Sequence, residues 1–268
     1  MRLRQGVNVQ GAIDQLHQLE LNAYNHTADD ESYVLFVSGL ELRFDEWFTE
    51  VPPRLLYSQR FWQINDGIPR RPHEMRRQEC ARVVALLTSL REELTGMAKR
   101  LGPPPRTLGV LDTNVLLHYK LLTDVRWTEV IGKSPVTLVI PIRVLAEMDG
   151  KKAAPNNPKL RSRARTRINL LEAVLRGEGF LYPVRENVAV TVVGSVELDP
   201  ETRRRTPLPP DVEILDVCAA LGAYAPNAVS LVTGDLAMKM HAREAGITVT
   251  PMSEDCYQPL GEADELPH

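Results

Sequence analysis

The chain has 268 residues, of which 43% are hydrophobic and 25% charged, and its formal net charge at pH 7 is −3. This composition is typical of a soluble protein with one large domain or two modest ones, and it excludes a strongly basic molecule whose overall field attracts nucleic acid. The three cysteines (Cys80, Cys218 and Cys256) have no zinc-site spacing and no readable disulfide framework. The N-terminal sequence lacks the apolar run of a secretory signal, and no stretch approaches the ~18 apolar residues of a membrane span. We therefore expect a cytoplasmic protein that does not enter a membrane.

The sequence changes character at residues 101–106, LGPPPR, because three consecutive prolines cannot continue a helix. Before this point, apolar residues recur at helical spacing over Gln78–Arg100, and less regularly over Ile13–Leu21. Residues Tyr33–Phe48 are compatible with a helix or a hairpin. These patterns predict a mainly helical region of unknown role at 1–106, a second domain at 107–252 and a C-terminal tail at 253–268.

From Thr107 onward, short β-branched runs alternate with helical segments. The expected strands are Leu108–Leu111, Val136–Pro141, Val188–Val193, Val229–Thr233 and Ile247–Thr250. The expected helices are Val115–Leu122, Ile142–Met148, Arg161–Arg176, Asp211–Tyr224 and Leu236–Ala245. This alternation predicts an α/β fold in which helices cover both faces of a parallel sheet. In such sheets, ligands bind beyond the carboxyl ends of the strands.

Four acidic residues of this second domain come from separate segments near those strand ends. Asp112 and Asp235 follow two of the expected strands, Glu147 lies on the helix after VTLVIP, and Asp211 opens the helix after a proline-rich loop. Each aspartate taken alone has a simple alternative role as the N-cap of its helix. If the strands are neighbours, the four carboxylates converge, and such a cluster predicts Mg²⁺ or Mn²⁺ as the cation that offsets their repulsion.

Two polar residues stand beside these acids. Asn114 lies two residues after Asp112, where its side chain could hydrogen-bond a carboxylate and fix its rotamer. Thr233 lies two residues before Asp235 and could do the same or bind a phosphate. The alternative for both is a capping or turn role.

Four stretches, VLDTNVLL, IPIRVLAEMDGKK, PDVEILDVCAAL and LVTGDLAMKMHAREAGI, occur in the order of a known family. With them the chain resembles the PIN domain, which toxin–antitoxin ribonucleases share with eukaryotic RNA-decay and rRNA-processing nucleases. The resemblance covers about 145 residues and implies a PIN-like α/β/α sandwich with a central parallel sheet and a metal-binding acidic pocket. Carried over residue by residue, it assigns the catalytic, metal-binding acids to Asp112, Glu147, Asp211 and Asp235, and the polar companions to Asn114 and Thr233.

The third acid has an alternative in Asp216. On a helix of ~3.6 residues per turn, Asp216 lies about 140° from Asp211, so both cannot face one pocket equally, and we favour Asp211. The chain also departs from the small toxin type. It has about 100 additional N-terminal residues and a long insertion around Gly177–Pro210.

Residues 151–170 contain seven basic residues and no acid. The arginines alternate along an expected helix, which would scatter them over a wide, solvent-facing surface that binds phosphates. A merely solvated helix is the alternative. The candidate RNA-binding residues are Lys151, Lys152, Lys159, Arg161, Arg163, Arg165 and Arg167.

Together these patterns predict an endoribonuclease that hydrolyses phosphodiester bonds of single-stranded RNA with Mg²⁺ or Mn²⁺. One alternative is an inactive PIN-like module that binds RNA or protein, and another is a structure-specific DNA nuclease. The N-terminal region is a candidate surface for a partner or inhibitor protein, and the family resemblance is compatible with a homodimer. In that region, Arg70, Arg71, Arg76 and Arg77 predict either a solvated helix entrance or an auxiliary RNA contact.

Overall fold

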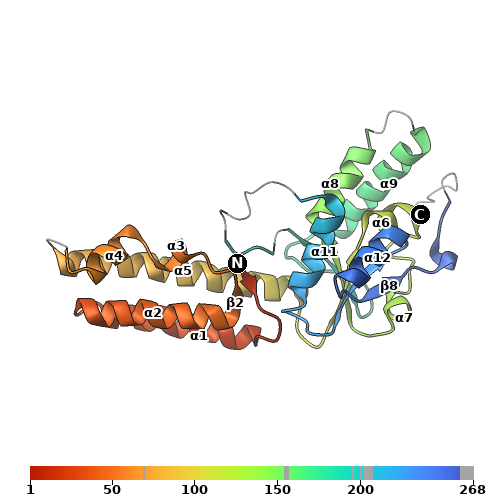
Figure 1. Cartoon of the computed structure of the whole chain (residues 1–268). Coiled ribbons are helices and arrows are strands. Elements are labelled where there is room, and N and C mark those ends of the chain that lie inside the picture. The colour runs from red at the N-terminus through yellow and green to blue at the C-terminus, as the bar shows by residue number, and fades with distance from the viewer. Residues whose placement is uncertain (69–70, 154–156, 195, 200, 202–207, 260–268) are drawn as a thin grey trace. The chain divides into compact units, whose positions relative to one another are not determined.

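The computed structural model in Figure 1 describes residues 1–68, 71–153, 157–194, 196–199, 201 and 208–259. The chain divides into two compact units. The first comprises Met1–Ala98 and Glu197–Arg205, and the second comprises Lys99–Val196 and Thr206–His268. In the part of the chain that is described, no helix combines the length and apolar character needed to cross a membrane.

The first unit is mainly helical, as the sequence predicts. Its elements are β1 (Arg2–Leu3), α1 (Val9–Asn22), η1 (Ala23–His26), α2 (Asp30–Trp47), β2 (Phe48–Thr49), α3 (Pro53–Leu56), α4 (Gln59–Asn65) and most of α5 (Pro72–Leu101). The helix-or-hairpin alternative resolves as the helix α2. Asp29 caps this helix by accepting a hydrogen bond from the Ser32 N–H at 2.7 Å, and the side chains of its buried face, including Tyr33 and Phe44, belong to the core of the unit.

Arg76 is buried in this unit, with 6% of its surface exposed. Its guanidinium donates to the carbonyls of Thr27 at 2.9 Å and Ala28 at 3.0 Å, and it also pairs with Asp30. The expectation of a solvated or RNA-binding Arg76 is therefore wrong, because this side chain ties α5 to the loop before α2. Arg71 and Arg77 are exposed, and Arg70 lies outside the described residues.

The second unit is built on a six-stranded sheet in the order β5-β6-β4-β3-β7-β8. The strands are β3 (Thr107–Leu111), β4 (Val136–Pro141), β5 (Tyr182–Arg185), β6 (Val188–Val193), β7 (Val229–Thr233) and β8 (Val249–Pro251). All pairs are parallel except β5 with β6. The predicted strands form, and the mostly parallel α/β fold is confirmed. The short edge strand β5 was not predicted; it turns back into β6 through Asn187, whose φ of 58° suits a tight hairpin.

Helices flank this sheet (Figure 1). They are α6 (Thr113–His118), α7 (Trp127–Ile131), α8 (Ile142–Lys151), α9 (Pro158–Val174), α11 (Pro210–Leu221), α12 (Leu236–Glu244) and the short η2 (Glu254–Cys256). Helix α6 ends earlier than the predicted Leu122. Its cap residue Tyr119 is extended, with φ −115° and ψ 172°, because it forms an isolated antiparallel bridge with Tyr257.

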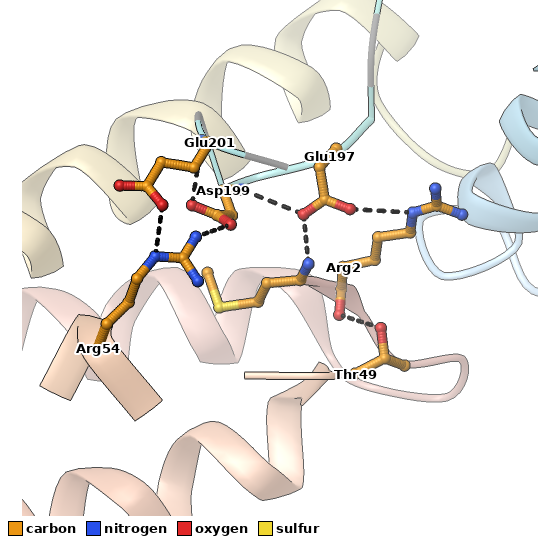
Figure 2. Close-up of polar contacts among 7 residues, drawn as sticks. Arg2, Thr49, Arg54, Glu197, Asp199 and Glu201 are labelled. Atoms are coloured by element: carbon orange, nitrogen blue, oxygen red, sulfur yellow. Dashed lines mark hydrogen bonds and ion pairs between the residues drawn. The ribbon is translucent and has the colours of Figure 1, made fainter. Parts of the chain in front are cut away.

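The segment after β6 contributes to the first unit, as Figure 2 shows. Arg54 of α3 reaches Asp199 at 2.5 Å and Glu201 at 2.7 Å. Arg2 lies 3.5 Å from Glu197, and the Leu198 N–H donates to the Met1 carbonyl at 3.0 Å. Since Glu197 and Asp199 are both buried, these contacts fix this part of the predicted insertion against α3 and the N-terminal residues Met1 and Arg2.

Candidate active site

Asp112 occupies the first position after β3, where it both caps a helix and faces a pocket. One carboxylate oxygen accepts from the Val115 N–H at 2.8 Å, and the other accepts from the Thr233 hydroxyl. Only 2% of Asp112 is exposed. Its pKa is raised to about 6, mainly by burial and to a smaller extent by the negative charge of Asp235, while the hydrogen bonds from Thr233 and Val115 lower it.

Asp235 follows β7 on the neighbouring strand and begins α12. It accepts from the Met238 N–H at 3.0 Å, and the Asn114 amide donates to its other oxygen at 3.5 Å. The Thr233 hydroxyl accepts from the Asp235 N–H at 3.0 Å while it donates to Asp112, so it links the two acids. The capping alternative is therefore correct for both aspartates, and it is compatible with a place in one pocket because β3 and β7 pair in parallel.

Glu147 reaches the same region from α8. The Thr113 hydroxyl donates to it at 2.6 Å, and the Arg143 guanidinium lies 3.7 Å from its other oxygen. Thr113 was not predicted from the sequence, although it lies between the two predicted site residues Asp112 and Asn114. A hydroxyl in the first turn of the helix that follows a candidate metal-binding aspartate is the signal that would have indicated Thr113.

All four predicted acids line one pocket with a volume of about 200 Å³. Its walls are Asp112, Thr113, Asn114, Glu147, Lys151, Asp211, Ile214, Asp235 and Met238. Asp211, the favoured third acid, is one of these residues, and its alternative Asp216 is not.

The donor chemistry of this pocket fits a hard divalent cation, because Mg²⁺ and Mn²⁺ prefer carboxylate oxygens. Among the described residues, no group of three or more acids, histidines or cysteines is already arranged to hold a metal ion. The fit therefore rests on four carboxylates that share a pocket with two hydroxyl or amide side chains able to hold them in place.

The basic segment differs from the expected solvent-facing surface. Arg163 and Arg167 are buried, with 4% and 5% exposed. The Arg163 guanidinium donates to the carbonyls of Gln258 at 2.6 Å and Pro259 at 2.5 Å, and Arg167 donates to the Gln258 side chain at 2.6 Å. The expectation that these two arginines face solvent is wrong. They lie four residues apart on one face of α9, and the C-terminal segment covers that face.

The other candidate RNA-binding residues have different surroundings. Lys151 lines the acidic pocket, and Lys152 pairs with Asp149 at 2.7 Å. Arg161 is half-buried, whereas Lys159 and Arg165 are exposed. A basic surface along α9 is thus limited to fewer side chains than the alternation predicts.

A family model described as PIN domain matches residues 109–253. The matched region runs from within β3 to beyond β8, and it contains every acid that lines the pocket. No curated protein matches the sequence.

Proposed function

Because the chain belongs to the PIN-domain family, whose members are generally nucleases, we propose that its second unit is an endoribonuclease that cuts single-stranded RNA with Mg²⁺ or Mn²⁺. The observation that carries the proposal is the convergence of Asp112, Glu147, Asp211 and Asp235 on one pocket. Helix capping accounts for Asp112 and Asp235 taken singly, but it does not account for Glu147 and Asp211 facing the same pocket, where like charges repel unless a cation offsets them.

The four acids hold the cation in this proposal. A bound divalent cation supplies the activation of water and the neutralisation of charge on the phosphodiester. Thr113 and Thr233 fix the rotamers of Glu147 and Asp112 through their hydroxyl groups. Lys151 is the basic side chain in the pocket wall, where it can bind the phosphate of the strand that enters.

The test uses the purified 268-residue chain and end-labelled single-stranded RNA, with EDTA, Mg²⁺ or Mn²⁺. Single-stranded DNA and a duplex RNA of the same sequence serve as competing substrates. We expect internal cleavage of the single-stranded RNA that requires the cation and exceeds cleavage of either competitor. Metal-dependent cutting of DNA alone would favour the DNA-nuclease alternative. RNA binding without cutting in any cation would favour the binding module.

The choice between Asp211 and Asp216 is testable by two matched substitutions on α11. We expect Asp211→Asn to lower the cleavage rate by about 100-fold or more, because it removes a carboxylate from the pocket. Asp216 is not one of the residues that line the pocket, so the cleavage rate of Asp216→Asn should stay within a few-fold of wild type. Equal losses in single-turnover rates for the two variants would contradict this assignment.

The pKa of Asp112 predicts how cation affinity depends on pH. Its metal-free pKa of about 6 means that the pocket must lose a proton to bind Mn²⁺ below that pH. We therefore expect the affinity for Mn²⁺ to fall about tenfold for each pH unit below 6 and to level off above 7. Calorimetric titrations at pH 5, 6, 7 and 8 measure this; a flat profile would show that Asp112 does not bind the cation.

A further inference from the structure

Tyr119 lies against Gly234, the residue that joins Thr233 to the pocket residue Asp235. A Cβ placed on Gly234 would stand 1.9 Å from the Tyr119 hydroxyl oxygen and 2.7 Å from the ring carbon that bears it. Both distances are far below any real carbon contact. The φ of Gly234 lies outside the left-handed region, so its backbone would accept alanine, and the Tyr119 side chain is what excludes one.

The C-terminal segment holds Tyr119 in this place. The Lys120 N–H donates to the Cys256 carbonyl at 2.8 Å, and the Gln258 N–H donates to the His118 carbonyl at 2.8 Å. The rings of Tyr119 and Tyr257 pack edge to face, with centroids 5.6 Å apart. The backbone on both sides of Tyr119 and one side of its ring are therefore fixed.

Gly234 is the centre of the turn on which the pocket depends. The hydroxyl of Thr233, the residue before it, donates a hydrogen bond to Asp112. The carboxylate of Asp235, the residue after it, accepts a hydrogen bond from the Asn114 amide. A shift of the turn by a few tenths of an ångström changes the geometry of both bonds, since hydrogen bonds weaken steeply as they lengthen or bend.

We infer that Tyr119, clamped by residues 256–258, is a positioning residue that sets the Thr233–Gly234–Asp235 turn and thereby the separation of Asp112 and Asp235. It acts by filling the space over Gly234. The inference rests on the proposed function only for its activity readout, because the placement of the turn can be measured without RNA.

The contact is tested by enlarging the side chain at Gly234 and by shortening the side chain at Tyr119, singly and together. We expect Gly234→Ala to reduce Mn²⁺ affinity and the cleavage rate at least tenfold, because the added methyl meets the Tyr119 hydroxyl and the ring carbons next to it. In the double variant Gly234→Ala/Tyr119→Ala the space is free, and both quantities should return to the level of Tyr119→Ala alone, which we expect to be several-fold below wild type. Gly39→Ala, whose added Cβ meets no atom within 4 Å, is the control for glycine replacement.

Tyr119→Phe separates positioning from chemistry by the hydroxyl. The ring carbons that stand 2.7 and 2.9 Å from a Cβ at Gly234 remain and still fill the space, so we expect Mn²⁺ affinity and the cleavage rate within about twofold of wild type. A Phe variant as impaired as the Ala variant would overturn the inference, as would a double variant no better than Gly234→Ala.

Hydrogen exchange of a peptide that spans residues 230–238 is the readout in metal-free protein. We expect faster exchange in Gly234→Ala and in Tyr119→Ala, wild-type exchange in Tyr119→Phe, and an unchanged exchange pattern in the first unit for all variants. If wild type cuts no RNA, the proposed function fails, yet Mn²⁺ titration and exchange still decide the role of Tyr119. Exchange that Tyr119→Ala leaves unaltered would overturn that role whatever the activity.

Discussion

Replacement of Asp112 by asparagine is expected to abolish RNA cleavage and, at the same time, to raise the unfolding temperature of the metal-free protein. The loss of cleavage follows from removing a carboxylate that a cation needs, and we expect at least about a 1,000-fold fall in the single-turnover rate. Asparagine retains an oxygen for the Val115 N–H and an amide that can donate to the Thr233 hydroxyl.

The gain in stability follows from the sign of the pKa shift. Burial raises the pKa of Asp112 from its ordinary 3.8 to about 6, so the folded protein binds this proton more tightly than the unfolded chain. Ionised Asp112 therefore destabilises the fold; the penalty is absent below pH ~4, grows through the window between 4 and 6, and is complete at pH 7. A neutral asparagine removes a penalty of about 1–3 kcal/mol.

Thermal melts in EDTA at pH 4 and pH 7 measure this effect. The Asp112→Asn variant should gain stability over wild type at pH 7 and show little difference at pH 4. Saturating Mn²⁺ should stabilise wild type but not the variant. Asp216→Asn serves as the control. A variant that melts earlier than wild type at pH 7 would show that the carboxylate is structural.

The predictable part of this site is the part that local pattern and topology control. Asp112 and Asp235 each follow a short apolar strand, and parallel neighbours bring such positions to one edge. Asn114 and Thr233 were indicated by their spacing from these acids. Thr113 was missed because its bond to Glu147 depends on how α8 packs beside α6, which no spacing along the chain reports.

The unpredicted contacts join segments that are far apart in sequence. Alternating arginines on α9 suggest exposure on all sides, but the C-terminal segment, more than 90 residues away, covers the face with Arg163. The Arg54–Asp199 pair likewise joins α3 to a segment within the insertion that is 145 residues away in the sequence. Such partners depend on chain closure over long loops, about which hydrophobic periodicity carries no information.

Arg163 and Arg167 lead to the second large expected effect. We expect the double substitution Arg163→Ala/Arg167→Ala to lower the free energy of unfolding of the second unit by about 2–4 kcal/mol, because it removes at least three charge-assisted hydrogen bonds in buried surroundings. Arg163→Lys should recover only part of this loss, since an ammonium group lacks the planar fork that reaches two carbonyls at once. Denaturant unfolding measures the stability of both variants, and hydrogen exchange in residues 253–259 then shows whether the C-terminal segment has come loose.

Exposed Arg165 provides the contrast on the same helix. Arg165→Ala should change stability by less than about 0.5 kcal/mol. If Arg165 contacts RNA, its loss weakens binding more at low salt than at high salt, because a phosphate contact releases counterions. The variant without Arg163 and Arg167 should instead unfold more easily. The dependence of its RNA affinity on salt concentration should be like that of wild type. If that variant kept full stability but had a shallower salt slope, the two arginines would be RNA contacts, and the C-terminal segment would not need them as its clamp.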